Sequence, residues 1–321
     1  MKIPKKINLA NLPTPLEVIS FRNKKFLIKR DDYTGTDFSG NKIRKLEYLL
    51  YQAKQSRAKI IFTCGATQSN HCRATAAAAA RVGIKTKLFL WGNDSTIADG
   101  NLFLSKIYGA EISYLNKLNY MNVNEIMEEE AYQYLKSGKK VYTIPEGGST
   151  VLGIWGYISF ISELMKQIDL KRIKGILCAS GTGGTAAGLL VGAAINKIKL
   201  NVYAVNVLYS KEKLQKKIMF LVEGLKRYYD LNFEVDESRL EIIDGYSNEG
   251  YKNISGDKLN LINNIAVETG ILFDPTYTGK AFNAFVDNFL LKDEGQKVIF
   301  LHTGGLFGAF AKREKYMQNL T

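Results

Sequence analysis

The chain has 321 residues, enough for one large domain or two ordinary domains with a full hydrophobic core. Hydrophobic residues make up 46% of the chain and charged residues 23%, as in an ordinary globular protein. No apolar run approaches the ~20 residues that a membrane helix needs, and the basic start lacks the continuous apolar segment of a signal peptide. These features exclude a membrane protein and lead us to expect a cytoplasmic one.

The three cysteines, Cys64, Cys72 and Cys178, lack Cys-x-x-Cys spacing, and the chain has only two histidines. This usage favours reduced thiols over a disulfide framework and predicts no metal site. The net charge of +13 is compatible with nucleic-acid binding, but the basic residues are dispersed and form no recognised nucleic-acid motif. We therefore predict no nucleic-acid partner. A basic protein that binds anions or nucleic acid is kept as the non-enzyme alternative.

Short β-rich runs alternate with helical stretches along the chain. Helices are predicted at Gln68–Val82, Val123–Ser137, Gly156–Gln167 and Thr185–Asn196, with an earlier helix inside residues 37–54. Repeated βα units indicate an α/β fold with a mostly parallel sheet, in which ligands bind at the carboxyl ends of strands. The predicted strands cover residues 24–32, 58–65, 86–92, 110–116, 139–148, 174–181, 200–207 and 296–305.

The helix inside residues 37–54 has an unusual first turn, which we expect Ser39 or Asn41 to cap. The turn carries Lys42, Arg44 and Lys45, although each cation at a helix N-terminus costs roughly 0.3–1 kcal/mol. These cations either face solvent or pair with distant acids, or one of them is not an ammonium ion. A positive field lowers the pKa of a lysine, and a neutral lysine can condense with an aldehyde.

The segment Ile176–Ala194 is predicted to be a strand, a glycine-rich turn and a helix rich in alanine and glycine. Backbone N–H groups at a helix N-terminus, with nearby hydroxyls, form a cradle for an anion. The turn lacks the lysine of an ATP-binding loop, and the next strand ends near Asn206 without a ribose-binding acid. The pattern therefore favours a single phosphate monoester over a turn that serves only packing. The turn consists of Ser180, Gly181, Thr182, Gly183, Gly184 and Thr185.

Polar residues also follow two other predicted strands. Ser69 and Asn70 can hold a planar ligand or merely cap the next helix, and His71 is interpreted as a structural or supporting polar group. Tyr277 can project into a cleft, and Thr303 can touch a bound ring. Together with the phosphate turn, these groups suggest pyridoxal 5'-phosphate, with Lys42 as the amine that forms a Schiff base with it.

The sequence resembles the 1-aminocyclopropane-1-carboxylate deaminase / D-cysteine desulfhydrase family of fold-type II pyridoxal-phosphate enzymes. The resemblance covers nearly the whole chain and rests on GNKIRKLEYLL, GATQSNHCR, PEGGSTVLGIWGY, SGTGGTAAGL, DPTYTGKA and LHTGG, in family order. It implies a two-lobed fold like that of the tryptophan synthase β subunit. The large lobe would comprise residues 1–43 and 154–321, the small inserted lobe residues 44–153. The resemblance also implies a homodimer.

The resemblance assigns roles to the candidate residues. It implies that Lys42 carries the cofactor and moves the α-proton of the substrate, and that Asn70 bonds the 3-hydroxyl of the cofactor ring. Residues 180–185 would hold the phosphate, and Thr303 would lie beside the ring. The remaining residues, Ser69, His71, Tyr277 and, as a second cleft tyrosine, Tyr251, would line the substrate side together with Asn70.

Two positions separate the branches of the family. The deaminases have Glu and Leu where this chain has Thr278 and Thr303, and the two threonines resemble the desulfhydrase branch. A carboxylate beside the pyridine nitrogen makes a deeper electron sink, which ring opening needs and β-elimination of a thiolate does not. We therefore expect a carbon–sulfur lyase that converts D-cysteine to pyruvate, hydrogen sulfide and ammonia. The alternatives are the cyclopropane deaminase and a cysteate sulfo-lyase.

Overall fold

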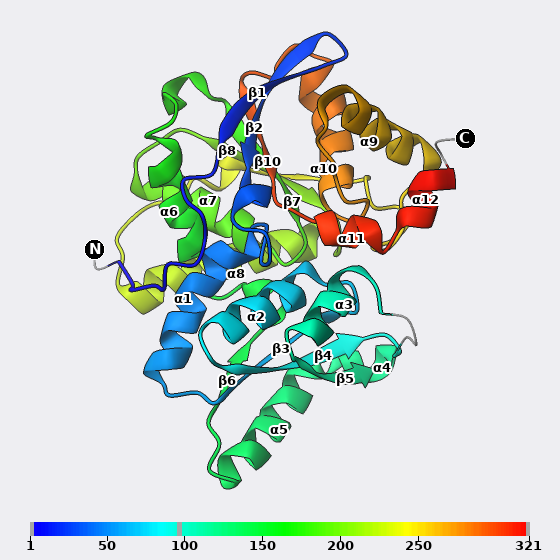
Figure 1. The fold of residues 1–321 in the computed structure, drawn as a ribbon. Helices are drawn as coiled ribbons and strands as arrows, with labels where there is room; N and C mark the ends of the chain where they lie inside the picture. The colour runs from blue at the N-terminus through cyan, green and yellow to red at the C-terminus, as the bar shows by residue number, and fades with distance from the viewer. Residues whose placement is uncertain (1–2, 95–97, 319–321) are drawn as a thin grey trace.

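The computed structural model describes residues 3–94 and 98–318 and contains two sheets, which lie one above the other in Figure 1. The larger sheet has the strand order β1-β2-β10-β7-β8-β9, and the smaller has the order β5-β4-β3-β6. The strands are β1 (Leu16–Phe21), β2 (Lys24–Arg30), β3 (Ile60–Ala66), β4 (Lys85–Trp91), β5 (Glu111–Leu115), β6 (Val141–Ile144), β7 (Gly175–Ser180), β8 (Asn201–Asn206), β9 (Leu240–Ile243) and β10 (Val298–His302).

The α-helices connect the strands and cover the faces of both sheets. They are α1 (Lys42–Gln55), α2 (Asn70–Arg81), α3 (Gly100–Ile107), α4 (Lys117–Met121), α5 (Val123–Lys136), α6 (Trp155–Leu164), α7 (Gly184–Ile195), α8 (Lys211–Tyr229), α9 (Gly256–Thr269), α10 (Thr278–Phe285), α11 (Leu306–Phe310) and α12 (Arg313–Gln318). The predicted α/β class with mostly parallel strands is confirmed, since every described strand pair except β1–β2 is parallel.

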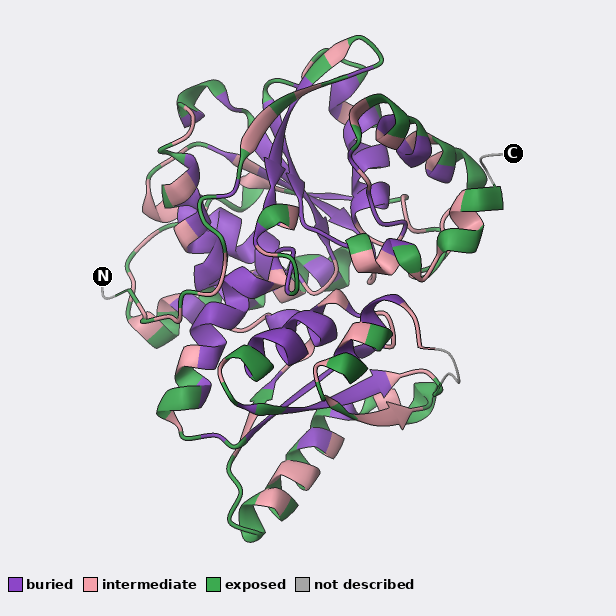
Figure 2. Cartoon of the chain, in the orientation of Figure 1, coloured by how far each residue is buried: buried purple, intermediate pink, exposed green. Residues whose placement is uncertain are grey.

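The larger sheet is buried on both faces, as Figure 2 shows for its central strands. Successive side chains of a strand point to opposite faces, so Ile176 and Cys178 pack against α6, α7 and α8. Leu177 and Ala179 pack on the other side, against α9 and α10. This double burial explains why the strand Gly175–Ser180 reads as a nearly continuous apolar run.

The smaller sheet is covered in the same way by helices from nearby in the sequence. Ile61 packs against α1 and the alanine-rich helix α2, whereas Ile60 and Phe62 pack against α5. Small alanine side chains let α2 approach α1 closely and bring its N-terminus near that of α1. The N-terminal ends of α1, α2 and α7 thereby surround one space between the two sheets.

The eight strands predicted from the sequence are all present, but two strands were not predicted. β1 is an edge strand whose side chains are mostly half-exposed, so its pattern resembles that of a surface loop. β9 has only four residues and forms the opposite edge of the sheet. The helices α3, α4 and α8 to α12 were not predicted either, and Tyr277, which was predicted to project into a cleft, directly precedes α10.

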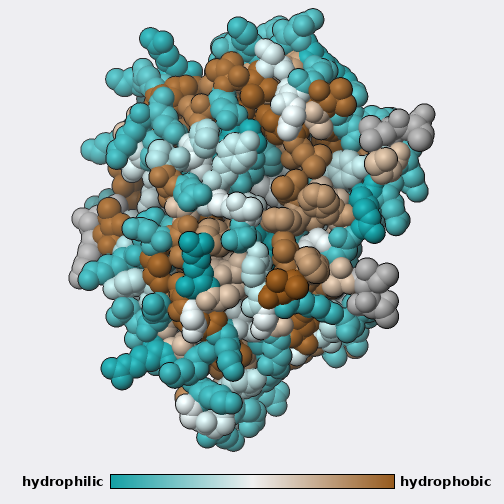
Figure 3. All heavy atoms as spheres, viewed as in Figure 1, coloured by the Kyte–Doolittle hydropathy of each residue, from teal (hydrophilic) through white to brown (hydrophobic). Residues whose placement is uncertain are grey.

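All three cysteines are free and buried. Within the described residues, no helix is long and apolar enough to cross a membrane. Hydrophilic side chains are spread over the face shown in Figure 3 and alternate with apolar ones. The smaller sheet is formed entirely by strands from residues 60–144, and the boundaries 43/44 and 153/154 between the predicted lobes stay a prediction.

Candidate active site

A pocket lies where the carboxyl ends of β3, β7 and β10 approach one another from the two sheets. It encloses about 700 Å³ of empty space, counting its opening to solvent. Every candidate site residue named from the sequence lines this pocket, although the roles of these residues stay predictions. They are Lys42, Ser69, Asn70, His71, Ser180, Gly181, Thr182, Gly183, Gly184, Thr185, Tyr251, Tyr277 and Thr303.

Lys42 is the first residue of α1 and is half-buried at the pocket wall. Its ammonium donates a hydrogen bond to Asn41 Oδ1 over 2.9 Å. Burial lowers the pKa of Lys42 to about 8, against the opposing attraction of the Asp274 and Glu146 carboxylates. With that pKa, about a tenth of the Lys42 amines are neutral at pH 7, which makes this lysine a competent nucleophile.

The other two cations in the first turn of α1 have different environments. Arg44 is buried and donates paired hydrogen bonds to both Asp31 oxygens at 2.8 Å, and it also bonds Glu163 at 2.8 Å. Arg44 therefore faces neither solvent nor the predicted phosphate turn. For Arg44, the prediction that a cation of this turn pairs with distant acids is confirmed. Lys45 lines the pocket, and its Nζ lies 2.8 Å from where a Cβ on Gly184 would be, at the phosphate turn.

The start of α1 also differs from the prediction in its capping. Asn41 occupies the N-cap position with helical dihedral angles and makes no capping hydrogen bond with its side chain. The Asn41 amide instead donates to Thr185 Oγ1 at 3.0 Å. The backbone of Asn41 donates to Thr303 O at 3.1 Å, and a Cβ on Gly40 would lie only 2.6 Å from that carbonyl. These contacts fix Lys42 between the phosphate turn and the end of β10.

The predicted phosphate turn joins β7 to α7, and its last residues form the N-terminus of α7. Thr182 Oγ1 and Ser149 Oγ are 2.7 Å apart, so a loop from the other sheet contributes a hydroxyl. A Cβ on Gly184 would lie 2.4 Å from Ser149 Oγ, which explains why glycine is needed here. Burial, and then the charge of Lys42, lower the pKa of Lys45 well below its ordinary value, and a bound anion would favour its charged form. With Lys45 beside it, the turn offers backbone donors, hydroxyls and a basic amine to an anion.

Ser69, Asn70 and His71 lie at the turn between β3 and α2. Ser69 caps α2 by accepting a hydrogen bond from Cys72 N at 3.2 Å, as the capping alternative predicted. Ser69 also lines the pocket. Asn70 Oδ1 accepts from Asn101 Nδ2 at 3.0 Å. Burial, and then the charges of Lys42 and Lys45, lower the pKa of His71 well below its ordinary value, so this imidazole is neutral.

Two buried polar atoms of the pocket have no hydrogen-bond partner within the described residues. They are Ser180 Oγ, at the phosphate turn, and His71 Nδ1, whose ring bonds Thr63 through Nε2 at 2.8 Å. A buried polar atom without a partner costs about 1–3 kcal/mol. Both residues line the pocket, where polar groups of a ligand could supply the missing partners. The donor set fits a phosphorylated aldehyde.

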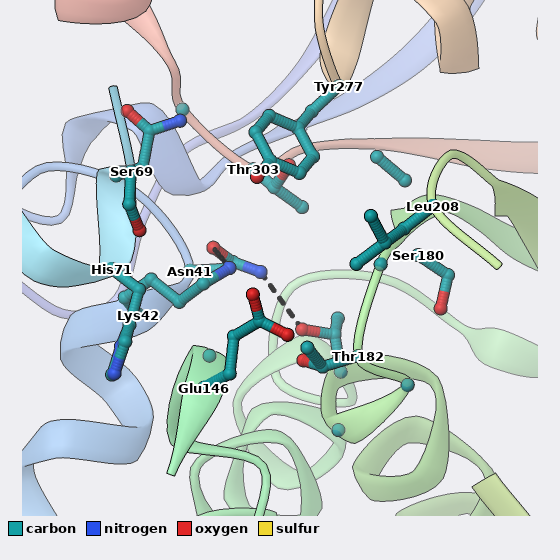
Figure 4. A pocket seen from close by; sticks show the side chains of 18 of the residues that line it. Asn41, Lys42, Ser69, His71, Glu146, Ser180, Thr182, Leu208, Tyr277 and Thr303 are labelled. Carbon is teal, nitrogen blue, oxygen red and sulfur yellow. Dashed lines mark hydrogen bonds between the residues drawn. The ribbon is translucent and has the colours of Figure 1, made fainter. Parts of the chain in front are cut away.

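The opposite wall carries neutral hydroxyl groups. The Tyr251 and Tyr277 hydroxyls are hydrogen-bonded to each other, and burial raises the pKa of Tyr277 well above its ordinary value. Thr303, the last residue before Gly304, completes this wall. Figure 4 shows Tyr277 and Thr303 together on one side of the pocket, facing Ser69 and Glu146.

Thr278 is not among the residues that line the pocket, and the branch argument from its hydroxyl stays a prediction. Thr278 is fully buried, and its Oγ1 donates to Asp274 Oδ1 over 2.7 Å and accepts from Asp274 N over 2.9 Å. The Asp274 carboxylate also accepts backbone N–H bonds from residues 276–278 and belongs to this turn. Thr278 therefore supports the chain around Tyr277.

Glu146 is a pocket residue that the sequence reasoning missed. It follows β6 in the PEGGS motif, at the end of a predicted strand. This position could have marked Glu146 as a candidate site residue. Asn41 and Leu208 also line the pocket and were not predicted as site residues. The side chains of Asn41, Glu146 and Leu208 give no sign of a role in a binding site until their neighbours in the fold are known.

Comparison with known proteins places this geometry in context. Residues 7–304 match the family described as "Pyridoxal-phosphate dependent enzyme". A protein of Thermotoga maritima, described as a candidate 1-aminocyclopropane-1-carboxylate deaminase, is 38% identical over 97% of this chain and 99% of its own length. A mitochondrial protein of Arabidopsis thaliana, named a bifunctional D-cysteine desulfhydrase/1-aminocyclopropane-1-carboxylate deaminase, is 34% identical over 95% of this chain and 79% of its own.

A solved structure agrees with this similarity. The crystal structure of a protein named as the ACC deaminase homologue superposes with a TM-score of 0.90 and is 33% identical. The match covers 98% of this chain and 96% of that one, so both sheets and all the pocket segments lie within the shared fold.

Proposed function

Because the chain belongs to the 1-aminocyclopropane-1-carboxylate deaminase / D-cysteine desulfhydrase family of pyridoxal-phosphate enzymes, we propose that it catalyses α,β-elimination of a β-substituted amino acid. The proposed substrate is D-cysteine, which with one water gives pyruvate, hydrogen sulfide and ammonia. Family membership favours an enzyme over the alternative of a basic binding protein.

The pocket supplies groups for each part of the cofactor. We propose that Lys42 binds it covalently, that residues 180–185 and Lys45 hold its phosphate, and that Asn70 bonds the ring hydroxyl. When bound, the cofactor spreads the negative charge that develops on the α-carbon of the substrate. The residues of this chain then have to orient the substrate and move its protons.

Lys42 is the base in this proposal. Lys42 would be free to act once the amine of the substrate had replaced it on the cofactor. Its lowered pKa would then leave a neutral amine that can take the α-proton, after which the bond between Cβ and sulfur would break and the electron pair would leave with the thiolate. Tyr277, paired with Tyr251, can donate a hydrogen bond to the departing sulfur. The 2-aminoacrylate that is released then hydrolyses to pyruvate and ammonia.

The observation that carries the choice of reaction is the chemistry of the wall formed by residues 274–278 and 303–304. The side chains that line the pocket there, Tyr277 and Thr303, are neutral, and the Asp274 carboxylate is bonded within its own turn. Because the side chains that line the pocket on this wall carry no carboxylate, the wall favours β-elimination over ring opening, since elimination of a thiolate needs a weaker electron sink. The deaminase activity in the names of both relatives is the second candidate.

The test is an assay of the purified holoenzyme with both cysteines, both serines, β-chloroalanine, cysteate and the cyclopropane amino acid. We expect sulfide and pyruvate to form fastest from D-cysteine and only traces of ketobutyrate from the cyclopropane amino acid. Rapid ring opening by the unmodified protein would overturn the proposed reaction.

A cytoplasmic location and a homodimer remain predictions, and sedimentation equilibrium of the holoenzyme tests the dimer.

A further inference from the structure

Glu146 occupies a position that the proposed chemistry does not use. It begins a short turn, Glu146–Gly148, directly after β6 and Pro145. Two tyrosines donate to its carboxylate: Tyr120 from α4 to Oε1 at 3.0 Å, and Tyr209, from the segment after β8, to Oε2 at 3.2 Å. Figure 4 shows the carboxylate directed toward the middle of the pocket, in the space between Asn41 and Thr182. The two bonds hold it there from both sheets.

The other charged side chains of the pocket determine which substrates the Glu146 carboxylate would favour. Among the described residues that line the pocket, Glu146 is the single carboxylate, and Lys42 and Lys45, whose pKa values are lowered by burial, are the two lysines. Under the proposed function, Lys42 is engaged in amine chemistry. Lys45 lies 3.3 Å from both Gly147 O and Ser149 Oγ, on the side of the phosphate turn. No cation of the described lining is then left to receive an anionic group on the β-carbon.

Glu146 also lies where the pocket continues outward. Together with Ala66, Leu208 and Tyr251, it lines both the pocket and a neighbouring hollow. The other residues that line this hollow are Trp91, Tyr120, Met121, Tyr209 and one cation, Lys117. A group that extends from the reacting carbon toward this hollow must pass the fixed carboxylate. Two like charges in a partly desolvated pocket repel each other more strongly than in water.

We propose that Glu146 is a specificity-determining residue that admits amino acids with a neutral or cationic β-substituent and rejects those with an anionic one. The proposal rests on the proposed function, whose substrate class it narrows. D-Cysteine, serine and 2,3-diaminopropionate fall in the accepted class, whereas cysteate and aspartate fall in the rejected class. The sulfo-lyase alternative is thereby disfavoured.

The test uses asparagine and aspartate, which have nearly the same shape and differ in the charge of the side chain. Neither has a good leaving group on Cβ, so equilibrium binding to the holoenzyme can be measured by calorimetry, with both enantiomers of each. We expect the wild type to bind asparagine at least about tenfold more tightly than aspartate. Glu146→Gln should bind aspartate about tenfold more tightly than the wild type does and asparagine within about twofold.

Two control variants test whether the effect of Glu146→Gln comes from the charge at this position. They separate this charge from the shape of the side chain and from the net charge of the protein. Glu146→Asp keeps the negative charge and should still reject aspartate. Glu212→Gln removes one negative charge from an exposed position of α8 outside the pocket, and it should leave both affinities unchanged. Equal aspartate binding by wild type and Glu146→Gln, or an equal gain in Glu212→Gln, would overturn the proposal.

Failure of the wild type to bind asparagine would overturn it as well, because the pocket would then not accept a neutral substituent of this size. This outcome differs from failure of the proposed function. A protein that releases no sulfide from D-cysteine can still discriminate asparagine from aspartate, and the binding data then stand alone.

Discussion

At the scale of single residues, three basic side chains in one helical turn lie in three different environments. Lys42 lies at the pocket wall with a lowered pKa, Arg44 pairs with buried acids, and Lys45 faces the phosphate turn. Burial has the largest effect on the pKa of Lys42, so a positive helix N-terminus is not the main reason for a neutral amine. The chemistry of one residue thus depends on how deeply its neighbours bury it.

Lys42→Ala should abolish turnover and the covalent absorbance band of the cofactor while the protein keeps its fold. Lys42→Arg should fail equally, because a guanidinium does not form an imine. Lys45→Gln is the matched control: it should retain the covalent band but bind the cofactor about tenfold more weakly, through loss of a charged contact. Borohydride reduction followed by mass spectrometry identifies the linked residue. A reducible link that persists in Lys42→Ala would assign the linkage to another lysine.

At the scale of elements, two buried polar clusters hold the pocket segments in place. One joins the turn that follows β2 to α1 and α6 through Asp31, Arg44 and Glu163, and Tyr157 OH donates to Asp31 at 2.6 Å. The other is the turn before α10, where Thr278 bonds Asp274. Both orient neighbouring pocket residues without contacting the pocket, so their variants should affect stability first.

Arg44→Gln should lower the free energy of unfolding by about 3–5 kcal/mol, because it leaves the buried Asp31 carboxylate without its guanidinium partner. The exposed pair between Arg172 and Asp169, 3.9 Å apart, supplies the matched control. Arg172→Gln should change stability by less than about 1 kcal/mol. Denaturant unfolding of both variants measures the difference. A small loss in Arg44→Gln, similar to that in Arg172→Gln, would contradict the structural role given to Arg44.

Thr278→Glu should destabilise the protein by about 3 kcal/mol or more, because it brings a second carboxylate beside the buried Asp274 and removes a hydroxyl donor. Thr278→Ser keeps the hydroxyl and should unfold close to the wild type. Thermal unfolding distinguishes the two variants. If Thr278→Glu is as stable as wild type and gains ring-opening activity, the glutamate reaches the pocket and our placement of Thr278 is incorrect.

At the scale of the whole molecule, the two sheets form one pocket because chain segments far apart in the sequence meet there. Arg44 bonds Glu163, Asn41 bonds Thr185, and Tyr209 bonds Glu146. Several of these contacts involve charged groups, so the stability of the molecule should depend on pH. Glu163 shows the effect clearly, since its own burial raises its pKa but Arg44 and Lys29 outweigh this and lower it to about 2.

Stability should therefore fall in acid. The pKa of Glu163 is lower in the folded chain than its ordinary value of 4.5, so its contribution is present above pH 4.5 and is lost as the pH falls toward 2. The loss should be about 3 kcal/mol. Glu163→Gln should be less stable than wild type at neutral pH and should show a weaker dependence on pH below 4.5. Unfolding midpoints between pH 2 and pH 7 measure this, and parallel curves for the two proteins would contradict it.

The sequence by itself determined the α/β class, the eight main strands and two of the segments that line the pocket, the turn at residues 180–185 and the helix start at Lys42. These features depend on local patterns: hydrophobic periodicity, glycine-rich turns and a lysine next to a helix start. The edge strands β1 and β9 escaped prediction because a strand with one free edge is only partly buried and has a weak pattern.

Only the tertiary structure decided what Arg44, Glu146 and Thr278 do. Arg44 and Glu163 are 119 positions apart, and Tyr209 lies 63 positions beyond Glu146, so no local pattern links these partners. Whether a charged or polar side chain faces solvent, a pocket or a buried partner depends on which distant segment packs against it. Burial and pairing are properties of the folded chain, and they set the pKa of Lys42 and the charge that a substrate meets in the pocket.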